Sequence, residues 1–281
     1  MNFIQNPDII KKILYGEADD LGTRIYIHKN YSKSGLDWDD WVISRLPARS
    51  FVNVLDLGCG NGRFIFSLLD RKIGNNFTGI DISESNIDFA KSELLRYNNT
   101  NVVFRIENVE EYRFEQSGYD LIMCNHMLWH MKKLSEFLGK ISVTLCPEGI
   151  LLITTNSAGY MRKMYDLHLE SAGYLGFPEN ILKQNFFNNS FSVENGYEIL
   201  SGYFRNIKKN VLKDELEFSE LTPFMKYYMT FLKSQMKIFK NIDENLWIEL
   251  IKLISSKVEN EIKTKGKFII NKTSGAFIAN K

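Results

Sequence analysis

The sequence predicts an α/β fold in which a parallel sheet is covered by helices on both faces. Five short apolar runs, each of strand length, alternate with segments whose apolar residues recur at helical spacing. A glycine cluster follows the first run, at the turn into the next helix. Because alternating strands and helices are typical of βαβ units, these strands are expected to be parallel and buried on both faces.

Residues 1–50 are expected to form a helical cap ahead of the sheet. Trp38 and Trp41 are one helical turn apart, Asp37 stands where an N-cap belongs, and Pro47 ends the segment.

The alternating part then runs from the first strand to about Asn156. Strands are expected at residues 51–57, 77–80, 102–106, 119–124 and 150–154, and helices at 64–69, 83–97 and 131–145. A serine at 83 or 85 caps the second of these helices, and Pro147-Glu148-Gly149 forms the turn into the fifth strand.

The alternation stops after Asn156. Residues 157–205 are expected to form irregular helices rich in aromatic residues, and residues 219–262 two longer helices. The chain is expected to close with a hairpin of residues 267–271 and 276–279 around a turn at Thr273-Ser274-Gly275.

Composition excludes several classes of protein. The 281 residues are 44% hydrophobic and 25% charged, which argues against disorder. Thirty-five basic and 34 acidic residues give a net charge of +1, which argues against a dedicated nucleic-acid or membrane-surface binder. The three scattered cysteines (Cys59, Cys124 and Cys146) form neither a disulfide framework nor a zinc pattern and favour a reducing cytoplasm. The start of the chain does not read as a signal peptide, and no apolar run approaches the ~20 residues of a membrane span.

The most informative stretch is Asp56-Leu57-Gly58-Cys59-Gly60-Asn61-Gly62, where the first strand turns into a helix. Gly58 and Gly60 permit a close approach of a ligand to the backbone. Asp81 follows at the end of the second strand, where nucleotide-binding α/β folds place an acid that accepts hydrogen bonds from ribose hydroxyls. Together, the loop, its context and the acid indicate a nucleoside site.

The loop does not fit a dinucleotide. Its third glycine comes one residue earlier than in G-x-G-x-x-G, and Asp56 would repel a pyrophosphate. A carboxylate there suits a cationic amino group, so an amino-acid-bearing nucleoside is favoured over NAD. No Gly-Lys-Ser/Thr follows, which excludes a P-loop.

These residues resemble the class I S-adenosylmethionine-dependent methyltransferases. The segments 120–130, 145–149, 154–156, 191–196 and 266–279 are similar to a bacterial small-molecule methyltransferase group, so the resemblance extends from about residue 20 to the chain end. It implies a Rossmann-like, mostly parallel seven-stranded sheet with an N-terminal helical cap and a helical insertion after strand five. It also implies one domain, 1–281, with the cap at 1–50, the cofactor-binding core at 51–156, and acceptor-side helices and the closing hairpin at 157–281.

The resemblance further implies S-adenosyl-L-methionine as cofactor, S-adenosyl-L-homocysteine as product, and a set of cofactor contacts. Asp56 and the loop would hold the methionine part, Asp81 the ribose, and Asn125 the sulfonium region. Asn108 stands where an acid is usual, but its amide oxygen can still accept from the adenine amine. The full expected cofactor set is Tyr31, Asp56, Gly58, Cys59, Gly60, Asp81, Ile82, Asn108, Val109 and Asn125.

His126 is the candidate catalytic base, since it follows the fourth strand and its reference pKa near 6.5 lies close to cellular pH. The alternative is a structural histidine that orients Asn125. His130 lies four residues on, but a metal pair would need a third ligand that the neighbouring sequence does not supply. Trp129, Asn156 and Tyr160 are the expected acceptor-binding residues.

The function expected from these features is methyl transfer to a small molecule or short peptide, for example in natural-product biosynthesis. Two alternatives stay open: methylation of an RNA base, and a non-catalytic protein that binds the cofactor. The near-neutral charge argues against nucleic acid, and the intact loop argues against loss of catalysis. The acceptor and the oligomeric state are not determined by the sequence.

Overall fold

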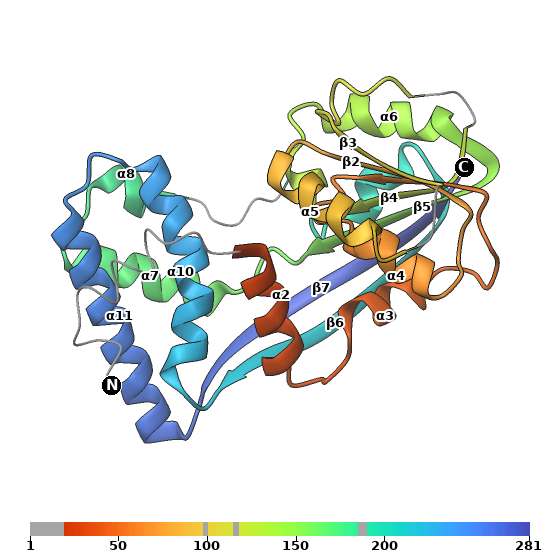
Figure 1. Ribbon diagram of the computed structural model, residues 1–281. Helices are drawn as coiled ribbons and strands as arrows, with labels where there is room; N and C mark the ends of the chain where they lie inside the picture. Colours follow the sequence, from red (N-terminus) through yellow and green to blue (C-terminus); the bar gives the residue numbers. More distant parts are fainter. Residues whose placement is uncertain (1–19, 98–100, 115–117, 185–189) are drawn as a thin grey trace. The chain divides into compact units, whose positions relative to one another are not determined.

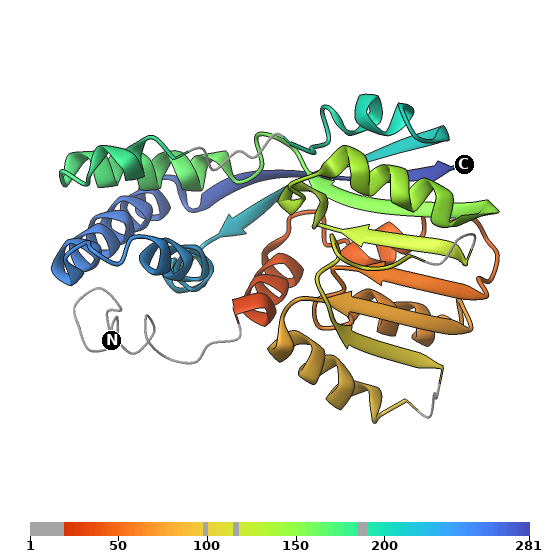
Figure 2. The ribbon, with the colours of Figure 1, turned by 90° about the horizontal axis from the view of Figure 1, so that it is seen from above.

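The computed structural model describes residues 20–97, 101–114, 118–184 and 190–281 (Figure 1). It contains a seven-stranded sheet of order β3-β2-β1-β4-β5-β7-β6, whose strands fan out in Figure 2. The strands are β1 Asn53–Leu57, β2 Asn76–Asp81, β3 Val102–Ile106, β4 Tyr119–Asn125, β5 Leu145–Asn156, β6 Arg205–Phe218 and β7 Phe268–Asn280. Strands β1 to β5 are parallel and β7 is antiparallel to β5, which confirms the mostly parallel seven-stranded sheet.

The helices follow the expected order. They are α2 Asp20–Tyr31, α3 Trp38–Ile43, α4 Arg63–Asp70, α5 Glu84–Leu94, α6 Leu134–Thr144, α7 Arg162–Tyr174, α8 Glu179–Leu182, α9 Gly196–Ser201, α10 Leu221–Ile238 and α11 Glu244–Lys265, with a 3-10 turn η1 at Leu128–His130. The caps match the sequence, because Asp37 accepts hydrogen bonds from the first N–H groups of α3 and Ser83 accepts one at α5.

The two faces of the sheet bury different residues of the same strands. Val54 of β1 packs in a cluster with α3, α4 and α5, whereas Leu55 and Leu57 pack in a cluster with α6. Successive side chains of a strand point to opposite faces, so the continuous apolar run of β1 requires helices on both sides. The expectation that helices cover both faces of the sheet is therefore confirmed, whereas the expected turn at residues 147–149 is wrong, since these residues belong to β5.

The chain forms two compact units. The sheet unit comprises described residues within 37–158, 190–212 and 273–281, and the helical unit comprises 20–36, 159–184 and 213–272. The expected cap is divided between them, with α2 in the helical unit and α3 in the sheet unit. Helices α2, α7, α10 and α11 share one apolar core in the helical unit, together with the ends of β6 and β7.

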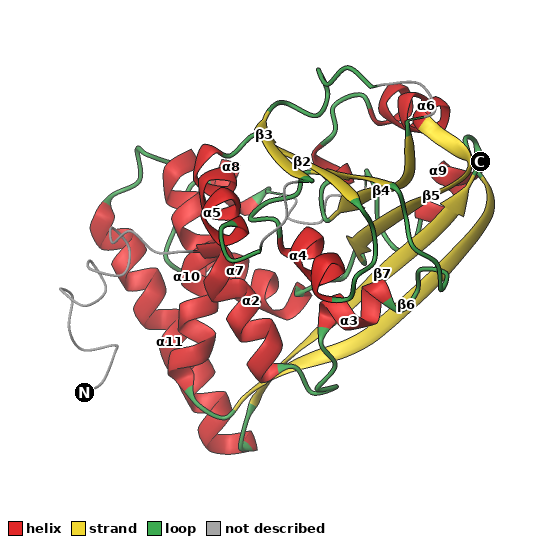
Figure 3. Ribbon diagram, turned by 45° about the vertical axis from the view of Figure 1, so that its right-hand side comes forward, coloured by secondary structure: helices red, strands yellow, loops and turns green. Residues whose placement is uncertain are grey.

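The predicted closing hairpin is wrong. Residues 268–280 form one continuous strand, β7, which pairs with β5 from Ile150↔Asn280 to Asn156↔Ser274. Its other neighbour is β6, a 14-residue strand that the sequence interpretation missed, and the two run side by side in Figure 3. Gly275 does not make a turn: a Cβ there would lie 3.1 Å from the backbone oxygen of Asn210 in β6, so the glycine permits close approach of the strands.

Among the described residues, no helix combines the length and the apolar character needed to cross a membrane.

Candidate functional site

The glycine loop lies at the carboxyl end of β1, and its backbone is fixed by hydrogen bonds to β2. The N–H groups of Gly58 and Cys59 both donate to the carbonyl oxygen of Ile80, at 2.8 and 2.9 Å. Gly58, Gly60 and Gly62 have φ of 70°, 54° and 79°, in the left-handed region that favours glycine. The backbone path of the loop therefore favours glycine at positions 58, 60 and 62.

Asp81 ends β2 and faces this loop. One carboxylate oxygen accepts from the backbone N–H of Gly60 at 2.8 Å, and the other accepts from the N–H of Ser83 at 2.9 Å. These two donors hold the carboxylate in place while leaving it partly exposed. Each carboxylate oxygen has a further lone pair with which it can accept from a hydroxyl.

Asp56 is the most unusual group of the site. It is 1% exposed, and neither carboxylate oxygen receives a hydrogen bond from the described residues. Burial raises its pKa to about 8; the nearby Asn125 amide opposes this, and the charge of Asp81 adds to it. Nδ2 of Asn125 is likewise buried without a partner, although its oxygen accepts from Thr154 Oγ1 at 3.2 Å. Unpaired buried polar atoms are costly, so they mark a place for a ligand with complementary charge.

The loop expected to meet the adenine, residues 107–109, is held by hydrogen bonds of its first residue and of Glu110, which follows it. Its first N–H, from Glu107, donates to the carbonyl of Asp81 at 3.1 Å, and Glu110 accepts from the N–H of Lys132 at 2.9 Å, just ahead of α6. Asn108 forms the turn: its oxygen accepts from the N–H of Glu110 and its Nδ2 donates to Glu111. Val109 is buried and Ile82 is 73% exposed, so Ile82 is free to contact a ligand.

His126 follows β4 directly, at the carboxyl edge where Asp56 and Asp81 also lie. Its φ of 52° is left-handed, which is uncommon for a residue with a Cβ, and such strain concentrates at functional sites. The ring centroid lies 5.5 Å from those of Trp38 and Trp129. Burial, reinforced by the charge of Arg63, lowers the pKa of His126 to about 4, so the imidazole is neutral at cellular pH.

The residues expected to bind the acceptor belong to different units. Trp129, half-buried in η1, donates from Nε1 to His130 Nε2 at 2.9 Å. Asn156 ends β5 and accepts from Ser274 Oγ at 2.9 Å. Tyr160 belongs to the helical unit, as does Tyr31, whose ring stacks on Phe218 at 5.4 Å.

The sequence analysis missed a polar cluster in the helical unit. Nε2 of His28 lies 3.0 Å from the hydroxyl of Tyr160 and 3.2 Å from that of Tyr227, and its Nδ1 lies 3.5 Å from Lys272 Nζ. These residues come from distant parts of the chain, so no spacing in the sequence points to them.

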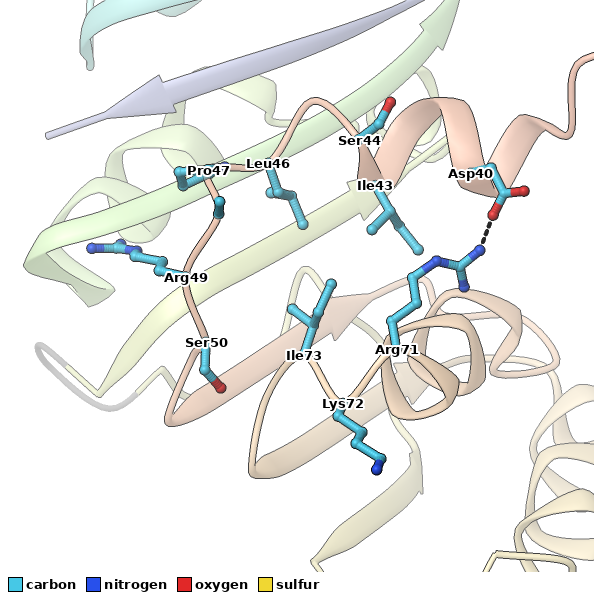
Figure 4. A pocket seen from close by; sticks show the side chains of 11 residues that line it. Asp40, Ile43, Ser44, Leu46, Pro47, Arg49, Ser50, Arg71, Lys72 and Ile73 are labelled. Carbon is cyan, nitrogen blue, oxygen red and sulfur yellow. Dashed lines mark hydrogen bonds and ion pairs between the residues drawn. The ribbon is translucent and has the colours of Figure 1, made fainter.

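A pocket of about 460 Å³ lies elsewhere in the sheet unit. Figure 4 shows the side chains that line it. Ile43, Leu46 and Ile73 line it, and Arg71 at its edge is paired with Asp40. The lining comes from the segments that precede β1 and β2, at the amino ends of these strands. The pocket is therefore at the opposite edge of the sheet from Asp81 and does not coincide with the site described above.

The described residues contain no cluster of three His, Cys, Asp or Glu side chains able to hold a metal ion. Cys59 and Cys124 are buried free thiols, and burial raises the pKa of both, so neither is a reactive thiolate.

Comparison with known proteins identifies relatives for this chain. A family model described as a methyltransferase domain matches residues 49–220, more than half of the chain. The chain is 34% identical over 150 residues to a malonyl-[acyl-carrier protein] O-methyltransferase of Bacillus cereus, covering 53% of each protein. It is 31% identical over 140 residues to a ubiquinone biosynthesis O-methyltransferase of Rickettsia bellii, covering 48% of this chain and 56% of that one. The match thus spans about half the length of these relatives.

The fold also matches solved structures. Phosphoethanolamine N-methyltransferase 2 of Haemonchus contortus, solved with phosphomonomethylethanolamine and S-adenosylhomocysteine, superposes with a TM-score of 0.56 over 95% of this chain and 58% of that one. At 19% identity, this likeness shows a shared fold.

Proposed function

Because this chain belongs to the class I S-adenosylmethionine-dependent methyltransferases, we propose that it methylates an oxygen atom of a small molecule or short peptide. The two sequence relatives named above are both O-methyltransferases, which supports the choice of oxygen. Natural-product biosynthesis is the setting that we propose for such a reaction. The near-neutral charge supports a small acceptor over RNA.

The observation that carries the proposal is the unpaired carboxyl of Asp56 at the carboxyl edge of the sheet. An α-ammonium group would supply the missing donors and the opposite charge. Asp81, held by two backbone N–H groups, is poised to accept from ribose hydroxyls. The residues present therefore fit the cofactor.

We assign the remaining contacts in the same way. Asn125 would face the sulfonium region, Ile82 and Val109 the adenine ring, and Asn108 the adenine edge. Asn108 uses its side chain within its own turn, so its adenine contact would come from a second lone pair or the adjacent backbone. Tyr31 would reach the carboxylate end. The backbone of Gly58, Cys59 and Gly60 would line the methionine part.

When bound, S-adenosylmethionine supplies an electrophilic methyl group on a sulfonium. The protein would exclude water and align the acceptor oxygen with that methyl group, which accounts for much of the rate in such displacements. His126, neutral at cellular pH, would accept the proton of an acceptor hydroxyl, and Trp129, Asn156 and Tyr160 would contact the acceptor.

The test is to incubate the protein with S-adenosylmethionine carrying a deuterated methyl group and a small-molecule extract. Mass spectrometry should detect S-adenosylhomocysteine and a deuteromethylated small molecule, and Asp81→Ala should lower the yield of both at limiting S-adenosylmethionine. Label in nucleosides from added RNA would instead support the RNA alternative. Tight cofactor binding with no S-adenosylhomocysteine from any extract would support a non-catalytic binding protein.

A further inference from the structure

The pocket at the amino ends of β1 and β2 has an apolar floor. Ile43, Leu46 and Ile73 point toward one another in Figure 4, and Ile43 is 5% exposed. The pocket volume of about 460 Å³ lies in the range of small-molecule sites. Burial of apolar surface is favourable, so a hydrocarbon group placed against these three side chains would be stabilised there.

The rim of the pocket carries an excess of positive charge. Arg49, Arg71 and Lys72 line the pocket, whereas Asp40 is the one acidic side chain among the described residues that line it. Asp40 pairs with Arg71, and Arg49 donates only to the uncharged backbone carbonyl of Glu148. No carboxylate pairs with Arg49 or with Lys72 in the part of the chain that the structure describes. Two positive charges are therefore unbalanced at this pocket, which favours an anionic ligand.

Arg71 can bind an anion while it stays paired with Asp40. One terminal nitrogen of its guanidinium donates to the carbonyl oxygen of Ser67 at 2.6 Å, and the other donates to Asp40. A guanidinium has five N–H groups, so hydrogens remain for a second acceptor. Hydrogen bonds from arginine to a carboxylate or a phosphate are charge-assisted and stronger than neutral ones, so Arg71 is suited to hold the charged end of a ligand.

Lys72 stands at a backbone position that favours glycine. It follows the C-cap residue Arg71 of α4, and its φ is 56°. Helices commonly place glycine there, because the left-handed conformation is strained for a residue with a Cβ. The lysine therefore contributes an exposed positive charge to the rim but no favourable backbone energy. Its charge and its effect on the fold can be separated by replacing it with glycine.

We propose that this pocket binds an organic anion with a short hydrocarbon body and a carboxylate or phosphate head. The body would lie against Ile43, Leu46 and Ile73, and the head would bind Arg71 with further attraction from Lys72 and Arg49. All of these residues belong to the sheet unit. The inference is independent of the proposed function, because the pocket and Asp81 lie at opposite edges of the sheet.

The test is calorimetric titration of the protein with matched probes. Hexanoate and hexyl phosphate carry both a body and an anionic head, hexanol and hexylamine carry the body alone or with a cation, and acetate and inorganic phosphate are heads without the body. Hexanoate or hexyl phosphate should bind at least about tenfold more tightly than any of the other four, because the apolar contact and the charge both contribute. The tighter of the two identifies the preferred head. Equal binding of hexanol or hexylamine, or equal binding of acetate and phosphate, would overturn the proposal.

Hydrogen exchange locates the bound probe. Asp40 and Ile43 of α3 line the pocket, as do residues 71–73 beyond α4. The tighter probe should therefore slow exchange in residues 38–43 and 71–73 in the absence of S-adenosylmethionine. Protection confined to other segments would place the probe elsewhere and overturn the proposal.

Three variants remove or oppose the positive charge. Arg71→Met and Lys72→Gly should each weaken binding of the tighter probe at least about fivefold. Lys72→Gly should keep or raise the stability against denaturant, because a φ of 56° suits glycine, so its loss of binding cannot come from misfolding. Ala48→Glu should abolish binding, because it adds a carboxylate at an exposed residue of the lining.

Arg96→Met is the matched control, because Arg96 is exposed, pairs with Glu93 at 2.7 Å and does not line the pocket. It should leave the affinity for the probe unchanged. S-adenosylmethionine should not displace the probe, since the two sites lie at opposite edges of the sheet. Full affinity in both Arg71→Met and Lys72→Gly, or displacement of the probe by S-adenosylmethionine, would overturn the proposal.

Discussion

At the scale of single residues, Asp56 combines complete burial with a free carboxyl. Its pKa of about 8 means that it is mostly protonated at pH 7 before a ligand arrives. An ammonium group would favour the ionised form, so binding of S-adenosylmethionine should release close to one proton. Calorimetry at pH 7 in buffers of different ionisation enthalpy measures this number, and Asp56→Asn should reduce it to near zero. Equal proton release in that variant would contradict the assignment of Asp56.

The same residue predicts a pH dependence of stability for the ligand-free protein. The folded pKa of about 8 lies above the unfolded value of about 3.9, so the folded state binds more protons between these limits. The Asp56 contribution to stability is fully present below about pH 4 and is lost as the pH rises through 8. Asp56→Asn should flatten this part of the stability profile, as measured by denaturant unfolding. An unchanged slope would show that other groups cause it.

Asp81 and Gly58 affect the cofactor in different ways. Asp81→Ala removes a charged acceptor and should weaken S-adenosylmethionine binding by about 1–3 kcal/mol. Gly58→Val should abolish binding, because a Cβ there would lie 3.1 Å from Cβ of Met127 and φ is 70°. Calorimetric titration measures both effects. Unchanged affinity in either variant would show that the site lies elsewhere.

His126 should set the acidic limb of the pH–rate profile near pH 4, well below the ordinary 6.5 of histidine. As a general base, its replacement in His126→Asn should lower turnover ~10²–10⁴-fold with cofactor affinity intact. Because the charge of Arg63 contributes to the lowered pKa, Arg63→Gln should move the limb toward higher pH. A fully active His126→Asn enzyme with an unchanged profile would assign catalysis to positioning alone.

At the scale of elements, α3 is joined to the helix that follows the glycine loop. Arg63, the first residue of α4, donates from Nε to Asp39 of α3 at 2.6 Å, and Ser67 Oγ donates to the same oxygen at 3.4 Å. We therefore expect S-adenosylmethionine to slow amide hydrogen exchange in residues 38–43. Asp39→Ala should remove this protection while the glycine loop still gains it. If α3 gains no protection from exchange in the wild type, it has no role in cofactor binding and serves only the fold.

Strand β7 depends on a glycine where the sequence suggested a turn. Gly275→Ala should destabilise the protein by about 1–3 kcal/mol, because its Cβ would lie 2.9 Å from Cγ2 of Val193 and 3.1 Å from the oxygen of Asn210. Gly139→Ala in α6 is the matched control, since its Cβ would have no neighbour closer than 3.9 Å. Denaturant unfolding should show a loss of stability in the first variant and none in the second.

At the scale of the whole molecule, β6 and β7 each contribute residues to both compact units. A strand cannot lose half of its pairing without weakening the rest, so we expect the two units to unfold together. Scanning calorimetry should show one transition, which S-adenosylmethionine at 100 times its Kd should stabilise by about 2.7 kcal/mol. Two transitions, of which the ligand shifts only one, would show that the units are independent.

The expected division of one domain into a cap, a cofactor-binding core and acceptor-side helices stays a prediction. The single domain of 1–281 and its three segments describe the order of the chain, whereas the compact units are assembled from segments that alternate along it. Such an arrangement arises because the chain enters the helical unit after β5, returns to the sheet unit at α9, and then passes between the units twice more, along β6 and along β7.

The sequence by itself determined the features that local chemistry controls. The apolar runs predicted β1 to β5, and Asp37 and a serine at 83 or 85 predicted helix starts, of which the structure shows Asp37 and Ser83. The glycines with Asp81 predict a nucleoside site at the carboxyl edge of the sheet. These signals are local: a left-handed turn requires glycine, a cap requires a short polar side chain, and a strand buried on both faces requires a continuous apolar run.

Only the tertiary structure decided the rest. Strand β6 is polar and exposed along much of its length, so its residues show no apolar pattern that would predict a strand. Its place in the sheet is set by pairing with β7. The raised pKa of Asp56 and the lowered pKa of His126 come mainly from burial. The degree of burial of a side chain cannot be read from its residue type. The cluster of His28, Tyr160, Tyr227 and Lys272 joins four distant segments, because desolvation and hydrogen-bond direction depend on neighbours in space and not on neighbours in sequence.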